Sequence, residues 1–283
     1  MNDTNLKAET LNLRPMKSPQ QINQDGIVIR ECTTIEEFDE CVRLQREAFG
    51  LPDLEISPRR HLIVSRRAGG WTLGAFLDGQ MLGFVLHLVA VRDDDELIGY
   101  SHMMAVAKSA QNMGIGARLK WAQRERALSE KRSFIKWTWD PMQARNAHFN
   151  LNRLGVTVSS YGVNFYGTDY LTFPHEQADA VGLDSDRLFA GWDLLAPRVV
   201  ELAAGRDAAL LDSPAAEIEI PPDWHALVEH DPRAARREQL RVRAEFEQAF
   251  GVGLICAGFV RSEERPRYLL YQESKVQSTK SKV

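Results

Sequence analysis

The spacing of apolar positions changes several times in the first part of the chain, and each spacing predicts a different element. Residues 27–30 are a short β-rich run. Thr33 or Thr34 then caps a helix whose apolar residues recur every three or four positions, and Gly50 ends it. A second helical segment covers 58–67. The pattern therefore predicts one strand followed by two helices.

The next segments predict a sheet with helices between its strands. Two apolar runs flank Asp78-Gly79, a pair typical of a tight hairpin turn, so residues 72–77 and 81–91 are expected to be antiparallel strands. Further strands are predicted at 100–107 and 134–139, and a final strand or pair of strands at 156–166, with helices at 114–130 and 144–154 between them.

The C-terminal part predicts further strands and one long helix. We expect strands at 187–195, 217–220, 253–260 and 267–271, and a helix at 232–250. No internal repeat or low-complexity linker divides the chain, and the boundary is placed at 173–174. The predicted parts are a disordered tail at 1–26, a first domain at 27–173, a C-terminal α+β extension at 174–271 and a polar tail at 272–283.

Composition and charge exclude several classes of protein. The 283 residues are 44% hydrophobic and carry a formal charge of -4, so no whole-molecule field favours nucleic acid or anionic lipid. Neither a spanning apolar run nor a signal-peptide pattern is present, which favours a cytoplasmic location. The three cysteines, Cys32, Cys41 and Cys256, are widely spaced and predict neither a disulfide framework nor a metal site.

The most informative motif lies where a predicted strand gives way to a helix. Gly114 and Gly116 stand at the start of that helix, where free N–H groups and the helix dipole favour a phosphate and where side chains would obstruct its approach. Leu119 occupies the place of the third glycine of a dinucleotide fingerprint, and no Walker loop occurs. A tight turn without a ligand explains the two glycines equally well.

This motif resembles the acetyl-CoA signature of the GNAT superfamily of acyltransferases. Gln111, Gly114 and Gly116 match its fixed positions, and Met104 and Val106 match the end of its preceding strand. Residues 146–155 are similar to the family's second signature, and the resemblance covers 27–173. The segments 101–103, 137–141 and 161–167 are similar to a little-characterised branch of predicted GNAT acetyltransferases.

The resemblance implies a fold and a binding site for an acyl-CoA. The fold is α+β, a three-layer α/β/α arrangement whose mixed, mostly antiparallel sheet splays between two central parallel strands, with an added C-terminal α+β segment. Acetyl-CoA or another acyl-CoA would lie in that gap as co-substrate, without a metal. The implied cofactor-binding residues are Met104, Ala105, Val106, Gln111, Asn112, Met113, Gly114, Ile115, Gly116, Ala117 and Asn146.

The resemblance also implies candidates for proton transfer. Counting back four residues from Val106 reaches His102, whose ordinary pKa of about 6.5 suits a general base, although a hydrogen-bonded strand histidine is an equal alternative. In the family a tyrosine usually acts as the general acid, and Leu151 occupies its position in this chain. Tyr161, Tyr166 and Tyr100 are the candidate substitutes.

Five further positions have competing explanations, some functional and some structural. Asp140 either meets the amine or caps the turn that follows its strand. Asn146 either binds the cofactor or caps a helix. Lys120 and Arg124 are expected on a solvated helix face, with Arg118 or Lys120 as the alternative partner of a phosphate.

The leading hypothesis is an N-acyltransferase that moves an acyl group to the amine of a small molecule or protein by direct attack in a ternary complex. One alternative is a non-catalytic acyl-CoA sensor or assembly protein, which the missing tyrosine favours. A nucleotide-binding domain ranks last. The C-terminal part is expected either to shape the acceptor pocket or to form a homodimer contact.

Overall fold

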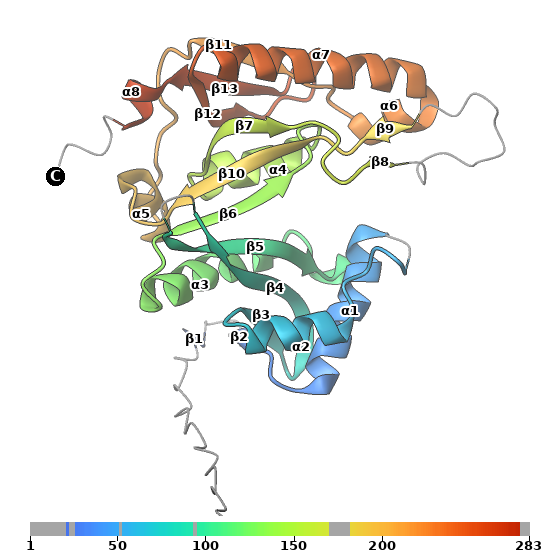
Figure 1. Cartoon of the computed structure of the whole chain (residues 1–283), viewed down its shortest axis with the longest axis vertical. Coiled ribbons are helices and arrows are strands. Elements are labelled where there is room, and N and C mark those ends of the chain that lie inside the picture. The colour runs from blue at the N-terminus through green and yellow to red at the C-terminus, as the bar shows by residue number, and fades with distance from the viewer. Residues whose placement is uncertain (1–20, 23–25, 51–52, 93–94, 170–181, 278–283) are drawn as a thin grey trace, which may run out of the picture.

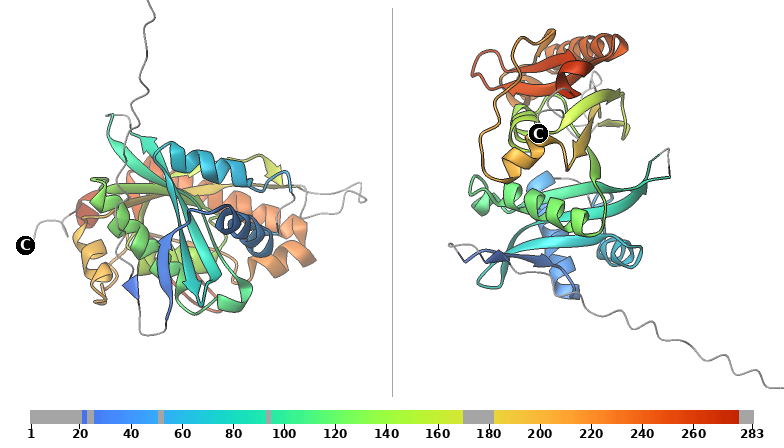
Figure 2. Two further views of the ribbon diagram at one scale, coloured as in Figure 1. Left: turned by 90° about the horizontal axis from the view of Figure 1, so that it is seen from below. Right: turned by 90° about the vertical axis from the view of Figure 1, so that its left-hand side faces the viewer.

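The computed structural model describes residues 21–22, 26–50, 53–92, 95–169 and 182–277. These residues form one 11-stranded sheet in the order β1-β2-β3-β4-β5-β6-β10-β7-β12-β13-β11, and a separate two-stranded pair, β8-β9 (Figure 1). Helices lie on its faces, and the N-terminal and C-terminal halves are stacked along the long axis (Figure 2). The predicted N-terminal tail lies outside the described residues except for Gly26 and β1, which pairs with β2.

The first half contains the predicted elements. Thr34 caps the first long helix: its side chain accepts a hydrogen bond from the N–H of Glu37, and the Glu37 carboxylate accepts one from the N–H of Thr34. Gly50 ends that helix in the left-handed conformation. The elements are β1 (Gln21–Ile22), β2 (Val28–Glu31), α1 (Ile35–Phe49), α2 (Arg59–Arg67), β3 (Trp71–Leu77), β4 (Gln80–Val91) and β5 (Leu97–Val106).

The sheet opens between β5 and β6 (Phe134–Trp139). These parallel strands pair only at Gly99↔Ile135 and Tyr100↔Lys136, although both continue beyond that point. On its other side β5 stays paired with β4 up to Val106. The predicted mixed sheet with a splay between two central parallel strands is therefore confirmed.

Helices flank this opening. The 3-10 turn η1 (Lys108–Ala110) leads into α3 (Ile115–Ser129), which packs on β3, β4 and β5. After β6 the chain forms α4 (Ala144–His148) and the π-helix η2 (Phe149–Arg153), where a single helix was expected. The strand or pair of strands expected at 156–166 is one shorter strand: β7 spans Thr157–Gly162, and β8 follows at Thr168–Asp169.

The C-terminal segment completes the same sheet. Strand β10 (Arg187–Asp193) lies between β6 and β7, antiparallel to both. Three short helices, α5, α6 and α8, were not predicted. The remaining elements are β9 (Leu183–Asp184), α5 (Pro197–Ala203), β11 (Ala216–Glu219), α6 (Trp224–His230), α7 (Pro232–Gly251), β12 (Leu254–Val260), β13 (Arg267–Gln272) and α8 (Glu273–Gln277). The expected boundary at 173–174 lies outside the described residues, as does the tail beyond 277.

Two large hydrophobic cores lie on either side of the opening. One joins β2 to β5 with the first helices and includes Phe84 and Leu119. The other joins β6, β7 and β10 with α4 and α7 and includes Trp137, Trp192 and Phe246. Because each half has its own core, the gap between β5 and β6 is bordered by two packed bodies.

Candidate functional site

The loop before α3 presents main-chain donors to an open space. Gly114 has φ 77° and caps the helix, and a Cβ added there would meet no atom within 4 Å. Within the described part of the chain, no acceptor takes a hydrogen bond from the N–H groups of residues 114–117. The first turn of a 15-residue helix thus combines unpaired donors with a positive dipole end.

Gly116 faces the same strand that borders the gap. A Cβ at Gly116 would lie 3.4 Å from Cε of Met104, an ordinary contact with the end of a flexible side chain. The space beside Gly114 is therefore open, whereas the end of the Met104 side chain lies beside Gly116.

Sequence reasoning missed Arg145, which comes from α4 on the other side of the gap. Its Nη1 donates to Oε1 of Gln111 at 3.4 Å, and its Nη2 donates to Oδ1 of Asn112 at 3.2 Å. The signal was available, because Arg145 directly precedes the matched Asn146. Arg145 places a second source of positive charge beside the loop.

The strand edge next to this loop is free of a strand partner. Val85, Phe84 and Gly83 of β4 pair with Met104, Ala105 and Val106 in register. On the opposite edge, β6 has already diverged after Tyr100. The backbone groups predicted to bind an extended ligand therefore face the opening.

His102 is the residue at which β5 is irregular. Met103 pairs with Leu86 and Ser101 with His87, so His102 is the extra residue of a β-bulge. The ring of His102 contacts the ring of His61 on α2, with centroids 5.6 Å apart. Burial, and secondly the nearby His61, lowers the pKa of His102 below its ordinary value. The imidazole is thus neutral near pH 7 and able to accept a proton.

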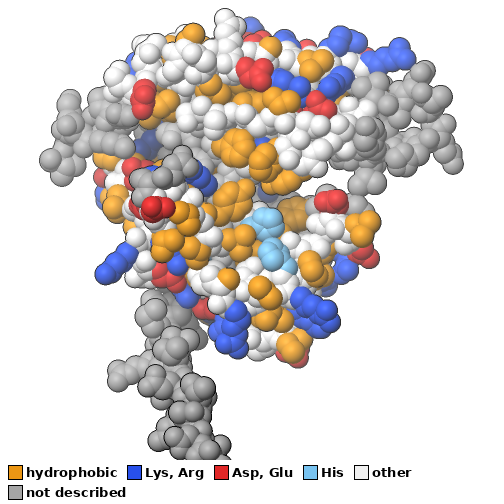
Figure 3. Space-filling model, viewed as in Figure 1, with side chains coloured by type: hydrophobic (Ala, Val, Ile, Leu, Met, Phe, Trp, Pro, Cys, Tyr) orange, Lys and Arg blue, Asp and Glu red, His pale blue; other side chains and the backbone are white. Residues whose placement is uncertain are grey.

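Three hydroxyl groups converge where the strands begin to separate. Oγ1 of Thr138 on β6 lies 3.4 Å from the hydroxyl oxygen of Tyr166, and both side chains are close enough to the Tyr100 hydroxyl to influence its pKa. Burial, followed by the adjacent Tyr166, raises the pKa of Tyr100. Tyr166 is 59% exposed. On this side of the molecule, apolar and histidine side chains gather along the boundary between the two halves (Figure 3).

Tyr161 lies apart from this group in a network of ions. Its hydroxyl donates to Oδ2 of Asp186 at 2.7 Å, and Arg243 donates to both oxygens of the same carboxylate. Burial and the Asp186 charge raise the pKa of Tyr161 far above its ordinary value. This hydroxyl is engaged in holding β7, β10 and α7 together.

Asp140 caps the turn that follows β6, which was the structural alternative to a contact with the amine. Its Oδ1 accepts from the N–H of Met142 at 2.8 Å, and its Oδ2 accepts from Nε2 of Gln143 at 3.2 Å. Burial raises the pKa of Asp140. Asn146 is exposed within α4 and is not its cap, since Gln143 holds that position.

The expectation that Lys120 and Arg124 lie on a solvated face is wrong. Lys120 is 2% exposed; its Nζ donates to Oγ of Ser101 at 2.8 Å and lies 3.7 Å from the centre of the Trp137 ring. Burial lowers the pKa of Lys120. Arg124 is also buried and donates to the carbonyl oxygen of Leu194. Both residues bind the halves together beneath the opening.

The Lys120 ammonium group also binds a second buried side chain, Gln123, which in turn contacts His87. Oε1 of Gln123 accepts from its Nζ at 3.1 Å, and Nε2 of Gln123 lies 3.2 Å from Nδ1 of His87. The His87 ring stacks on Trp71 with centroids 4.0 Å apart. Burial, with smaller contributions from nearby cations, lowers the pKa of His87 to about 3.

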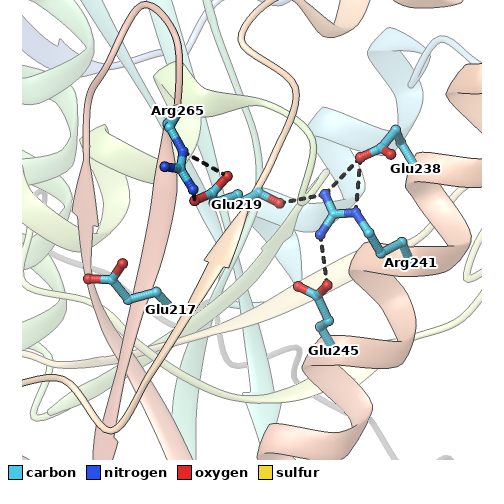
Figure 4. A pocket seen from close by; sticks show the side chains of 6 residues that line it. All are labelled: Glu217, Glu219, Glu238, Arg241, Glu245 and Arg265. Carbon is cyan, nitrogen blue, oxygen red and sulfur yellow. Dashed lines mark hydrogen bonds and ion pairs between the residues drawn. The ribbon is translucent and has the colours of Figure 1, made fainter.

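A charged hollow far along the sheet has its charges matched internally. Arg241 of α7 pairs with Glu238 and Glu245, and Arg265 pairs with Glu219 (Figure 4). Glu217 pairs with Arg267. This hollow is a surface ion network, and we assign it no binding role. Across the described residues, no group of three or more metal-ligating side chains converges, and no helix is long and apolar enough to cross a membrane.

Part of this chain matches the model of a known protein family. Residues 34–154 match the model of the acetyltransferase (GNAT) family. No curated protein matches the chain.

Solved structures with a similar arrangement include three bacterial proteins. A GNAT family acetyltransferase from Elizabethkingia anophelis with acetyl-CoA bound is 17% identical, with 60% of this chain and 100% of that chain covered and a TM-score of 0.44. A putative acetyltransferase of the GNAT family from Desulfovibrio desulfuricans is 13% identical over 59% and 99% of the two chains, with a TM-score of 0.47. A GNAT family acetyltransferase from Streptococcus pneumoniae is 18% identical over 58% and 97%, with a TM-score of 0.46.

Proposed function

Because residues 34–154 place this chain in the acetyltransferase (GNAT) family, we propose that it transfers the acetyl group of acetyl-CoA to an amine. The observation that carries the proposal is the opening between β5 and β6, which leads directly to the bare helix start at Gly114. An extended thioester arm fits an unpaired strand edge, and a diphosphate fits unpaired N–H groups.

The residues of the loop would hold the phosphates. The N–H groups of residues 114–117 supply donors without side chains in the way, and Arg145 supplies charge from α4. Main-chain groups of Met104, Ala105 and Val106 would hold the arm along β5. Binding at these places would hold the thioester arm along the strand that also carries His102 and Tyr100.

His102 is proposed as the base. The amine nitrogen must be neutral to attack the thioester carbonyl carbon, and it then loses one proton as the new C–N bond forms. The lowered pKa of His102 keeps its imidazole free to take that proton, directly or through one water.

Tyr166, backed by Tyr100 and Thr138, is proposed as the acid. The departing thiolate needs one proton when the C–S bond breaks, and a thiol has an ordinary pKa of about 8.5. Burial raises the pKa of Tyr100, so the Tyr100 hydroxyl stays protonated at neutral pH beside Tyr166. The Tyr166 hydroxyl, 3.4 Å from Oγ1 of Thr138, would supply the proton. Tyr161 and Asp140 receive no step, because their polar atoms are held by Asp186 and by the turn at 140–143.

A binding and turnover experiment tests the proposal. Isothermal titration with acetyl-CoA, coenzyme A, ATP and NAD should show selective binding of the two coenzyme A forms, and a panel of amines should release free thiol. Binding of ATP or NAD instead would overturn the acyl-CoA site. Binding of acetyl-CoA without thiol release from any amine would favour the sensor, which the buried Leu151 at the family's tyrosine position supports.

A further inference from the structure

Arg187, the first residue of β10, forms no ion pair with any of the described residues. In the described part of the chain no oxygen accepts a hydrogen bond from it, and its Nε is buried with no partner. A buried donor left unpaired destabilises the folded protein, and a ligand that accepts from it removes that cost. Its neighbour Asp186 is no remedy, since that carboxylate is held by Arg243, Tyr161 and the N–H of Asn164.

The guanidinium lies against the hydroxyl cluster of the proposed site. Its Cζ is 5.1 Å from the centre of the Tyr166 ring. Burial raises the pKa of both Tyr100 and Asp140, and the nearby charge of Arg187 opposes that rise in each. The oxygens of Asp140 are already used by Met142 and Gln143. A positive charge with free donors therefore stands beside the position of acyl transfer.

An aromatic surface lies next to Arg187. Phe165 packs edge-on against Tyr166, with centroids 4.7 Å apart, and against Phe189, with centroids 5.3 Å apart. Phe189 pairs with Thr138 across β6 and β10, so the two side chains share one face of the sheet. A Cβ at Gly162 would lie 2.6 Å from the Phe189 ring, so this glycine makes room for the ring. Phe165 and Tyr166 are both exposed.

We propose that Arg187 binds a carboxylate of the acceptor, and that the acceptor is a small amine bearing both a carboxylate and an aromatic ring, as in an aromatic amino acid. This inference rests on the proposed acyl transfer and names its substrate class. A guanidinium fork fits a carboxylate with two parallel hydrogen bonds, and the rings of Phe165 and Phe189 offer an edge or face to a planar group. The amine then points to the hydroxyls of Tyr100, Thr138 and Tyr166.

The test is equilibrium binding to protein saturated with coenzyme A. The probes are N-acetyl-L-phenylalanine, L-phenylalanine and phenethylamine, which keeps the ring and amine but lacks the carboxylate. We expect both carboxylates to bind at least about tenfold more tightly than phenethylamine, and Arg187→Gln to remove that difference, whereas Arg187→Lys keeps part of it. Arg265→Gln, at a surface ion pair on the far part of the sheet, is the matched control and should change nothing.

Two results would overturn the inference. One is phenethylamine binding as tightly as L-phenylalanine to the unmodified protein, a comparison that holds even where Arg187→Gln does not fold. The other is an unchanged preference for carboxylates in folded Arg187→Gln. Thiol release separates this inference from the general function. Equal kcat/KM for phenethylamine and L-phenylalanine keeps acyl transfer and rejects the carboxylate role, whereas Arg187-dependent binding without thiol release keeps the binding site and rejects the transfer.

Discussion

A Cβ atom at Gly99 would lie 2.2 Å from Cε1 of His87, so the buried ring occupies space that only glycine leaves open. Gly99 is also one of two β5 residues that pair with β6. We expect Gly99→Ala to force the ring or the strand aside and to destabilise the protein by about 1–3 kcal/mol. Urea unfolding measures this. Gly251→Ala, at the end of α7 where a Cβ meets nothing within 4 Å and φ is not positive, controls for the loss of a glycine. Equal midpoints for Gly99→Ala and the unmodified protein would contradict the expectation.

His87 should make folding sensitive to acid. Its pKa is about 3 in the folded chain and about 6.5 when unfolded, so the unfolded chain binds one more proton between these values. Stability from this group is complete above pH 6.5 and falls by up to about 1.4 kcal/mol per pH unit as pH drops toward 3. His87→Phe keeps a ring beside Trp71 but cannot titrate. Its unfolding free energy should depend less on pH in that window, and an identical slope would contradict the assignment.

His102 should carry the acidic limb of the activity profile. His102→Gln removes the base and should lower kcat by about 100-fold or more while leaving acetyl-CoA affinity unchanged. The fall in activity below the lowered His102 pKa should disappear with it. His230→Gln alters an exposed histidine at the end of α6 and serves as control. A variant that keeps its kcat and its acidic limb would reject His102 as base.

Gly116→Asp should move stability and binding in opposite directions. A carboxylate in the first turn of α3 favours the helix dipole by about 0.3–1 kcal/mol, yet it repels a diphosphate seated there. We expect a slightly higher melting temperature and at least about tenfold weaker acetyl-CoA binding. Gly116→Ala adds only a methyl group that makes an ordinary contact with Met104, so it is the uncharged control. Unchanged affinity for the aspartate variant would place the diphosphate elsewhere.

Arg145 should contribute to the affinity for phosphate and not to the chemistry. Arg145→Gln is expected to weaken acetyl-CoA binding about tenfold, or about 1.4 kcal/mol, with kcat unchanged at saturation. The difference should shrink at high salt, because Arg145 is exposed. Arg153→Gln, an exposed arginine on η2, is the control. A loss in kcat instead of affinity would argue against phosphate binding.

The sequence predicted local elements well because their signals are local. The cap at Thr34, the turn at Asp78-Gly79 and the strand at 134–139 depend on neighbours in the chain. Two glycines before a helix were the basis for predicting a phosphate site, and Gly114 does stand at the start of α3. The burial of Lys120 could not be predicted from the sequence, because its hydrogen-bond acceptor Ser101 and its aromatic partner Trp137 belong to two other elements.

The same limit applies to the candidate site. The meeting of Tyr100, Thr138 and Tyr166 depends on the register of β5, β6 and the segment after β7. The hydroxyl of Tyr161 is bound by Asp186, which lies 25 residues further along the chain. Asp186 is in turn bound by Arg243, which lies another 57 residues further on. Spacing in the sequence names such groups as candidates, and only the tertiary structure pairs them.

The position of β10 has a consequence for biosynthesis. Because β10 lies between β6 and β7, a nascent chain that has emerged only as far as β7 carries two strands whose shared neighbour is still to be made. The unpaired edges of β6 and β7 can pair with strands of other chains until β10 (Arg187–Asp193) has been synthesised. A fragment cut after β7 should accordingly aggregate, and a chaperone that shields strand edges would have its chief task during that interval.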